Sequence, residues 1–174
     1  MKSLLPAGKT LSIAAPTSYW YLKAFPVKDM ANYLDYIVYI TYDLHGQWDY
    51  DNAFASDGCP GGNCLHSHVN LTETLQVLAI ITKASVPINK IFVGESSYGR
   101  SFSMSDPTCT GPTYTYTGGF DVSTAQPGQC TLTGGYISNA EIYTLLSLGN
   151  NSKTWYNTNS NSDIMTWDSK FETA

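Results

Sequence analysis

Three short apolar runs, rich in isoleucine, valine and tyrosine, predict three strands in the first hundred residues of the chain. They cover residues 11–15, 36–42 and 91–97, and each is nearly continuous instead of alternating with polar residues. Strands that are buried on both faces of a parallel sheet have this composition. The pattern therefore predicts a parallel sheet in the first part of the chain.

Helical patterns lie between these predicted strands. A short one covers 27–33, and a stronger one begins at Asn70, where Asn70 and Glu73 form a capping-box-like start, and ends before Pro87. Its apolar residues follow the helical period at Leu71, Leu75, Leu78 and Ile81. The order strand, helix, strand, helix, strand is typical of βαβ units, so we expect an α/β fold.

The pattern changes in the second part of the chain. Residues 102–135 are dominated by threonine, serine, glycine, proline and tyrosine and show little helical period, so they predict short strands and turns. A helix follows, with Ser138 as its N-cap, Glu141 completing a capping box and Gly149 at its end.

These patterns divide the chain into three parts. We expect an α/β segment over 1–101, an α+β subdomain over 102–168 with a short strand near 164–167, and a truncated end at 169–174. We find no internal repeat and no interdomain linker.

Composition narrows the classes of function. The formal net charge is −5, which argues against nucleic acid and anionic membranes as partners, because these need basic patches. No apolar run approaches the roughly 20 residues of a membrane span. The chain has 13 tyrosines, 4 tryptophans and 6 phenylalanines. Such a surplus of aromatic rings suits stacking on sugar rings, and it also suits a β-rich core.

The four cysteines predict two local disulfides. Cys59 and Cys64 bracket the turn sequence PGGN, and Cys109 and Cys130 share a segment rich in threonine, glycine and proline. Among the three possible connectivities, the local pairs 59–64 and 109–130 are the economical ones. An even number of cysteines favours an oxidising, secretory compartment.

Sequons at Asn70 and Asn150 agree with an extracellular setting. The first sixteen residues do not form a signal peptide, because Pro6 and Gly8 interrupt the apolar run.

His66 and His68 stand near Cys64, but no fourth ligand occurs at a useful spacing, so we expect no metal site.

Polar and aromatic residues gather where each predicted strand ends. In parallel α/β folds functional side chains lie beyond the carboxyl ends of the strands. Aromatic faces beside hydrogen-bonding groups suit a polar ring with many hydroxyls, and Trp20, after the first strand, is one candidate for sugar stacking. The three clusters are Pro16 to Trp20, then Tyr42, Asp43, His45, Gln47 and Trp48, and then Ser97 to Arg100.

Three stretches of the sequence resemble family-18 glycoside hydrolases, the chitinases. These are LSIAAPTSYWYLK, YITYDLHGQWD and GESSYGRSF, and they resemble most the large fungal type related to the killer-toxin chitinase subunit. The resemblance implies a (β/α)₈ TIM barrel, of which this chain supplies about strands five to seven, with an α+β chitinase insertion after the seventh. At that size we expect a partial barrel and not a closed one.

The resemblance also implies roles for individual residues. Tyr42 is expected to hydrogen-bond the N-acetyl carbonyl of the substrate, and Asp43 to contact the sugar and tune the catalytic acid. Tyr98 and Arg100 are expected to bind neighbouring sugar hydroxyls, and Trp48 to lie along the cleft. The implied partners are chitin or N-acetylglucosamine oligomers, without a cofactor, and the mechanism is the substrate-assisted exception to the two-carboxylate rule.

Two departures from the family pattern qualify this reading. Ile40 replaces a methionine, a mild change at an apolar position, and the Asp-x-x-Asp-x-Asp-x-Glu motif, whose glutamate is the proton donor, occurs nowhere in the 174 residues. We therefore expect a chitinase fragment that is inactive by itself. Glu95, within a strand, and Glu141, in the capping box, are poor replacements for the acid.

Two alternatives to a chitinase fragment remain open at this point. The first alternative is a non-catalytic oligosaccharide-binding remnant. The second is an unrelated small α/β enzyme that uses His45 and Asp43. For His45 a structural hydrogen bond at the end of its strand is favoured over a role as a base.

Overall fold

The computed structural model describes residues 2–149, 151–168 and 170–173, and the chain forms two compact units. Unit 1 comprises Met1–Leu44 and Thr72–Glu95, and unit 2 comprises His45–Leu71 and Ser96–Ala174. Unit 1 has the α/β architecture that the sequence predicts, and unit 2 is built on antiparallel strands.

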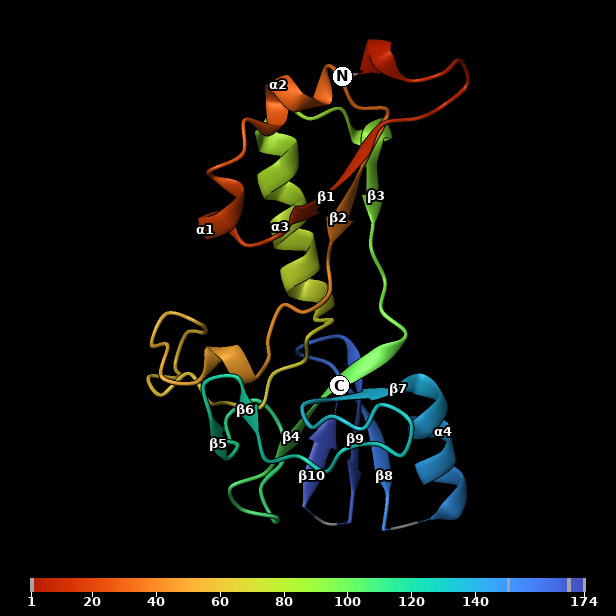
Figure 1. Ribbon diagram of the computed structural model, residues 1–174. Helices are drawn as coiled ribbons and strands as arrows, with labels where there is room; N and C mark the ends of the chain where they lie inside the picture. Colours follow the sequence, from red (N-terminus) through yellow and green to blue (C-terminus); the bar gives the residue numbers. More distant parts are fainter. Residues whose placement is uncertain (1, 150, 169, 174) are drawn as a thin grey trace. The chain divides into compact units, whose positions relative to one another are not determined.

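Unit 1 contains a three-stranded parallel sheet in the order β1-β2-β3 (Figure 1). Its strands are β1 (Ser12–Pro16), β2 (Tyr36–Ile40) and β3 (Ile91–Val93). All three predicted strands are therefore confirmed, although β3 ends well before residue 97. Beyond β3, Gly94 donates its N–H to the carbonyl of Tyr39 at 2.9 Å as the chain leaves the sheet.

The helices of unit 1 provide the other half of its core. Ile81 of α3 is fully buried with Ile37 and Tyr39 of β2, and the Tyr39 hydroxyl donates to the carbonyl of Val77 on α3 at 3.0 Å. Burial raises the pKa of Tyr39 to about 12, so this hydroxyl remains a donor. The helical elements of unit 1 are η1 (Lys2–Leu4), α1 (Tyr19–Leu22), α2 (Val27–Ala31), α3 (Leu71–Lys83) and η3 (Ile88–Lys90). Leu71, the first residue of α3, is assigned to unit 2.

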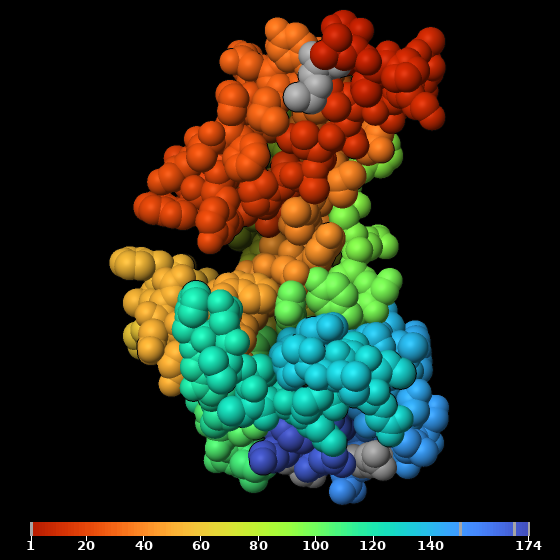
Figure 2. Space-filling view, viewed as in Figure 1, coloured from red at the N-terminus to blue at the C-terminus, as the bar shows by residue number. Residues whose placement is uncertain are grey.

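Unit 2 is built on a five-stranded antiparallel sheet in the order β7-β4-β10-β9-β8. Its strands are β4 (Tyr98–Ser103), β7 (Tyr136–Ser138), β8 (Lys153–Asn157), β9 (Ser162–Trp167) and β10 (Phe171–Thr173). A small hairpin of β5 (Gly118–Gly119) and β6 (Val122–Ser123) lies outside this sheet, as does the 3-10 turn η2 (Gln47–Asp49). Figure 2 shows the teal hairpin and the cyan segment that follows it side by side on the face of unit 2 in view.

Helix α4 (Asn139–Leu148) confirms the predicted helix of unit 2 and both of its end signals. The Ser138 hydroxyl accepts the N–H of Glu141, and the Glu141 carboxylate returns to Ser138, which is the reciprocal pair of a capping box. Gly149 adopts the left-handed conformation with φ 71°, as a C-terminal glycine should. Ile142 and Leu145 of α4 then pack against a buried cluster that includes Met165 and Trp167 of β9.

The boundaries of the two units differ from the expected division at residue 101. Segment 45–71 and strand β4 belong to unit 2, where the β4 backbone pairs with β7 and β10. Strand β10, in the part expected to be a truncated end, lies between β4 and β9 in the middle of the antiparallel sheet.

One of the two predicted disulfides forms. Cys59 and Cys64 are bonded, with their Cα atoms 6.1 Å apart. The predicted Cys109–Cys130 pair is wrong, because both thiols are free. Each cysteine sits in its own turn: the N–H of Cys109 bonds the carbonyl of Asp106 at 3.0 Å, and that of Cys130 bonds the carboxylate of Glu141 at 2.7 Å.

Among the helices that the structure describes, none is long and apolar enough to cross a membrane. Of the two sequons, the one at Asn150 lies outside the described residues.

Candidate functional site

Four side chains of unit 2 form a cluster of one cation and three aromatic rings. The Arg100 guanidinium carbon lies 4.8 Å from the ring centroid of Trp48, 5.3 Å from that of Tyr98 and 5.9 Å from that of Tyr136. All four residues are half-buried. Guanidinium groups at these distances from aromatic faces make cation–π contacts. We call these four residues the Arg100 cluster.

Strand β4 supplies Tyr98 and Arg100, whose spacing of two places both side chains on the same face of the strand. The antiparallel register sets Arg100 directly opposite Tyr136 of β7. The Tyr98 and Tyr136 rings meet edge to face with centroids 6.0 Å apart. His68 stacks on Tyr98 at 5.2 Å, and its Nε2 lies 3.0 Å from the Tyr98 carbonyl oxygen. The site residues on β4 are therefore held by contacts on two sides.

Trp48 is presented by the tight turn η2. An added Cβ on Gly46 would lie 2.3 Å from the Trp48 ring, so the indole packs directly on the Gly46 backbone. The Asp49 carboxylate closes the turn by accepting the N–H of Gly46 at 3.2 Å and pairing with Nδ1 of His45 at 2.9 Å. Both His45 and Asp49 are buried, which confirms a structural hydrogen bond for His45.

Gln47 has a different role from the one that its place after the second strand predicts. The side chain is buried, and its amide nitrogen donates to the carbonyl of Gly119 at 3.0 Å and to that of Thr117 at 3.4 Å. Gln47 therefore anchors the Trp48 turn to the β5 strand and does not lie open to a ligand.

Tyr42 and Asp43 follow β2 in unit 1. The Tyr42 ring packs on Gly94, because a Cβ there would lie 2.9 Å from its Cε1 atom, and the Thr41 hydroxyl donates to the Gly94 carbonyl at 2.7 Å. Asp43 takes a positive φ of 56°, which marks a sharp turn just after the strand.

Trp20 lies on α1 of unit 1 and is 70% exposed. The Lys23 ammonium lies 3.3 Å from the centroid of its ring. The structure therefore brings together three of the six predicted site residues, Trp48, Tyr98 and Arg100, within unit 2. The other three belong to unit 1, and a common site for all six stays a prediction.

Sequence reasoning missed Tyr136. Its position after two glycines suggests only the approach to a helix, and its place opposite Arg100 depends on the pairing of β4 with β7, which are more than thirty residues apart. The spacing of Tyr98 and Arg100 was a local signal that both side chains share one strand face, but it did not indicate which ring lies opposite.

Glu141 and Glu172 of unit 2 have pKa values shifted in opposite directions. Burial opposes ionisation of Glu141, but hydrogen bonds from Ser138, Cys130 and Thr131 outweigh it and hold its pKa at about 2. Glu141 is therefore a structural anion, as expected. Glu172 on β10 is also buried, and burial raises its pKa from 4.5 to about 7 although the N–H of Gly111 donates to it at 3.1 Å.

Glu95 follows β3 and is exposed, so its expected place inside a strand is wrong.

Among the described residues, no three His, Cys, Asp or Glu side chains are grouped so as to hold a metal ion.

The model of glycosyl hydrolases family 18 matches residues 3–173. The chain belongs to this family. Two fungal relatives agree with the match. A protein of Penicillium expansum named "Probable chitinase LysM11" is 60% identical over 178 residues, and the "Killer toxin subunits alpha/beta" of Kluyveromyces lactis is 38% identical over 168 residues. These alignments cover 99% and 97% of this chain, but only 16% and 14% of the relatives.

Solved family-18 structures show the same fold. A Group IV chitinase of Ostrinia furnacalis has a TM-score of 0.72 at 22% identity, and a class V chitinase of Nicotiana tobaccum has 0.71 at 19%. The similarity covers 95% and 94% of this chain and 44% of each of those chains. The chain thus spans less than half the length of the family-18 chitinases that it resembles in fold.

Proposed function

We propose that this chain supplies part of the substrate-binding surface of a family-18 chitinase, which cleaves β-1,4 linkages between N-acetylglucosamine units. The Arg100 cluster is the observation that carries the proposal. In this proposal the parallel sheet of unit 1 corresponds to about strands five to seven of a (β/α)₈ barrel.

The Arg100 cluster has the chemistry that an amino-sugar chain requires. Aromatic faces bind the flat apolar faces of sugar rings, and Trp48 and Tyr98 are held in place while remaining half-exposed. The guanidinium of Arg100 carries five N–H donors for hydroxyl and carbonyl oxygens.

The reaction that we propose is substrate-assisted. The carbonyl oxygen of the substrate's N-acetyl group attacks the anomeric carbon of its own sugar, and the bond from that carbon to the leaving oxygen breaks. Tyr42 donates a hydrogen bond that aligns the acetamido carbonyl, and Asp43 contacts the sugar and tunes the catalytic acid. Water then opens the cyclic intermediate with overall retention of configuration.

A glutamic acid must protonate the leaving oxygen in this scheme, and the Asp-x-x-Asp-x-Asp-x-Glu motif that bears it is absent from the 174 residues. Glu141 remains ionised within its capping box and is unsuited to that role. We therefore expect no hydrolysis by this chain alone.

A second candidate function is oligosaccharide binding without catalysis. One observation favours it: all members of the Arg100 cluster, the disulfide and two apolar cores lie within unit 2. Such a unit needs neither Tyr42 nor Asp43 to bind a sugar chain.

We also propose an extracellular location. A relative that is 53% identical over 170 residues is named "Secreted chitinase LysM12", and the Cys59–Cys64 disulfide suits an oxidising compartment. The proposed partner is chitin or its oligomers. The acidic net charge of −5 argues against nucleic acid and anionic membranes.

A chimera tests the proposal. The corresponding residues of the 60% identical Penicillium expansum relative are replaced by this chain. Two quantities are then measured: the release of products from an N-acetylglucosamine hexamer, and the anomeric configuration of the reducing end that cleavage creates. We expect retaining hydrolysis by the chimera and none by the chain alone. In the chimera Tyr42→Phe should lower kcat by about 10²-fold, because it removes the donor that aligns the nucleophile.

Hydrolysis by the chain alone that persists in a Tyr42→Phe, Asp43→Asn double variant would contradict this mechanism. Tight oligomer binding by the chain, together with an inactive chimera, would instead favour the binding module.

A further inference from the structure

We propose that Tyr116 is the positioning residue for the Trp48 stacking surface: its hydroxyl fixes the backbone on which the indole rests. This inference rests on the proposed sugar-binding role of the Arg100 cluster. It adds to that role a buried residue that acts through Gly46.

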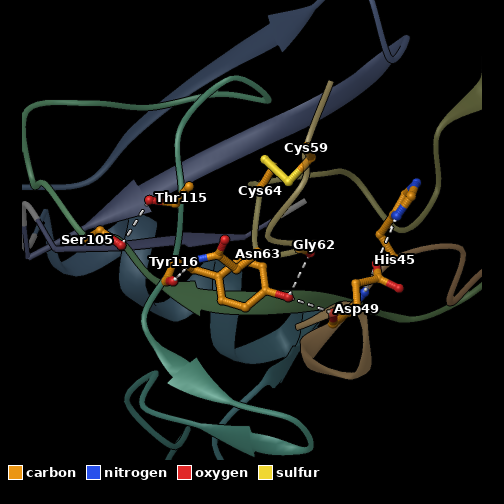
Figure 3. The surroundings of a disulfide bond; sticks show 10 residues. His45, Asp49, Cys59, Gly62, Asn63, Cys64, Ser105, Thr115 and Tyr116 are labelled. Carbon is orange, nitrogen blue, oxygen red and sulfur yellow. Dashed lines mark hydrogen bonds and ion pairs between the residues drawn. A yellow bond between two sulfur atoms is a disulfide. The ribbon is translucent and has the colours of Figure 1, made fainter. Parts of the chain in front are cut away.

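Tyr116 lies in the interior of unit 2, where only 1% of its surface is exposed. Its ring stacks on Phe102 of β4 with centroids 4.7 Å apart. Its hydroxyl lies 3.0 Å from the carbonyl oxygen of Gly46. It lies 3.5 Å from the carbonyl oxygen of Gly62, a contact that Figure 3 shows. A hydroxyl has one proton to donate, so the shorter contact to Gly46 is the principal hydrogen bond.

The backbone of Tyr116 is hydrogen-bonded to the loop that the disulfide closes, residues 59–64, which we call the disulfide loop. The N–H of Tyr116 donates to the carbonyl of Asn63 at 2.8 Å, and the Asn63 side-chain amide donates to the carbonyl of Tyr116 at 2.9 Å. Cys64, the next residue, is bonded to Cys59. The phenol therefore projects from a segment that is fixed to a covalently closed loop, as the view in Figure 3 shows.

The disulfide loop also packs against the C-terminal end of the turn that bears Trp48, at Asp49 and Asp51. Gly62 has a φ of 66°, and a Cβ at this position would lie 1.8 Å from the carbonyl oxygen of Asp49. The N–H of Asp51 donates to the carbonyl of Gly61 at 2.9 Å. The turn is thus held at its end by this loop and at its start by Tyr116.

Gly46 links the Tyr116 hydroxyl to the Trp48 indole, because it contacts both. The Trp48 indole packs on Gly46 so closely that a Cβ would overlap the ring, and Arg100 lies against Trp48 in turn. A hydrogen bond to the Gly46 carbonyl therefore fixes the peptide that sets the height and tilt of the indole. The Gly46 carbonyl also accepts the N–H of Asp49 at 3.0 Å, so loss of the phenol hydroxyl leaves it with one of its two donors and holds the start of the turn less tightly.

The hydroxyl of Tyr116 remains a donor over the whole physiological range. Burial raises its pKa, and the negative charge of Asp49 and the neighbouring Tyr50 raise it further. A phenolate at this position would face two carbonyl oxygens and would lose both contacts.

The variant Tyr116→Phe removes only the hydroxyl and keeps the stacking on Phe102. Tyr143→Phe is the matched control, since it removes a hydroxyl from a ring on α4 that is 69% exposed. The chain is labelled with 5-fluorotryptophan, and the Trp48 resonance is assigned by its loss in Trp48→Phe. We expect Tyr116→Phe to shift or broaden the Trp48 resonance and to leave that of Trp20, in unit 1, unchanged.

The second readout is affinity for an N-acetylglucosamine tetramer, measured well below the melting temperature. Tyr116→Phe should weaken binding by about three- to tenfold, and Tyr143→Phe should not. In a Trp48→Ala background Tyr116→Phe should have no further effect, because its influence passes through the indole. A role in stability alone would lower the melting temperature without this coupling.

The two readouts separate the inference from the function on which it rests. An unchanged Trp48 resonance in Tyr116→Phe overturns the positioning role, whether or not the chain binds sugar. A shifted resonance in a chain that binds no tetramer upholds the positioning role and contradicts the proposed function. The same variants in the chimera should raise KM more than they lower kcat, and an effect confined to kcat would count against the inference.

Discussion

The two units of this chain differ in how completely their own residues pair with and cover their strands. In unit 1 the sheet has three parallel strands, and its outer strand β3 bears Phe92 and Val93, which are 57% and 51% exposed. In unit 2 the strands β4 and β10 each have partners on both sides, and Met165 and Trp167 are buried under α4. Unit 2 therefore holds its candidate binding residues by its own contacts, whereas unit 1 leaves an apolar strand at its edge.

This difference separates two parts of the proposed activity. The Arg100 cluster, which binds sugar in our proposal, rests on the antiparallel sheet and the disulfide loop of unit 2. Tyr42 and Asp43, which act at the reacting sugar in our proposal, follow a strand of unit 1. Binding and catalysis should therefore respond differently to changes in each unit.

The largest effect is expected from the cores. Trp167→Ala removes a side chain that is 1% exposed from unit 2 and should cost about 3–5 kcal/mol of its free energy of unfolding. Ile81→Ala, in the core of unit 1, should cost about 2–5 kcal/mol there. Hydrogen exchange should show the α4 amides losing protection in the first variant and the α3 amides in the second. Loss of protection in both helices in either variant would show that the units unfold together.

A pH effect of similar size is expected from Glu172. Its pKa is about 7 in the folded chain against an ordinary value of 4.5, so the folded state favours the protonated form. The stabilisation is therefore fully present below about pH 4.5 and is lost as the pH rises to about 7, with a change on the order of 3 kcal/mol. Glu172→Gln should remove this dependence in denaturant titrations of unit 2. Glu95→Gln, at an exposed site, should keep it.

The disulfide should contribute somewhat less. Cys59 and Cys64 are five residues apart, and closing so short a loop stabilises by roughly 2 kcal/mol in the chain-entropy account. A Cys59→Ser, Cys64→Ser variant should lower the melting temperature of unit 2 and weaken tetramer binding through the Trp48 turn. The Cys109→Ser, Cys130→Ser variant is the control, and it should leave both unchanged, because these thiols are free.

The smallest effect concerns the start of α4. Ser138→Ala removes the hydroxyl that caps the helix and that donates to Glu141 at 2.7 Å, and it should cost about 1 kcal/mol. The depressed pKa of Glu141 adds a pH signature. Its stabilising contribution is present above about pH 4.5 and is lost as the pH falls towards 2, and Ser138→Ala should reduce that loss. A helix unaffected by Ser138→Ala between pH 2 and 7 would show that the capping box contributes nothing.

Local patterns in the sequence predicted the elements that depend on neighbouring residues. The continuous apolar runs located the three strands of unit 1, and Ser138, Glu141 and Gly149 located both ends of α4. The tight turn between Cys59 and Cys64 predicted their disulfide. In each case the signal and the structure lie within a few residues of one another.

The failures concern long-range pairing. Cys109 and Cys130 lie in one segment of similar composition but occupy separate turns. Tyr136 reaches Arg100 only because β7 pairs with β4. The buried hydrogen bond from Tyr116 to Gly46 joins residues seventy positions apart. No local pattern reports such contacts, because they are set by the register of antiparallel strands and by the packing of loops.

The central claim is that sugar binding resides in unit 2, and a calorimetric titration of the chain with an N-acetylglucosamine tetramer tests it most directly. We expect Trp48→Ala and Arg100→Ala each to weaken binding by about tenfold or more, because stacking and charged hydrogen bonds are lost. Tyr42→Phe with Asp43→Asn should change the affinity by no more than about twofold. The opposite result, with binding abolished by the unit 1 variants and unaffected by those at Trp48 and Arg100, would contradict the account.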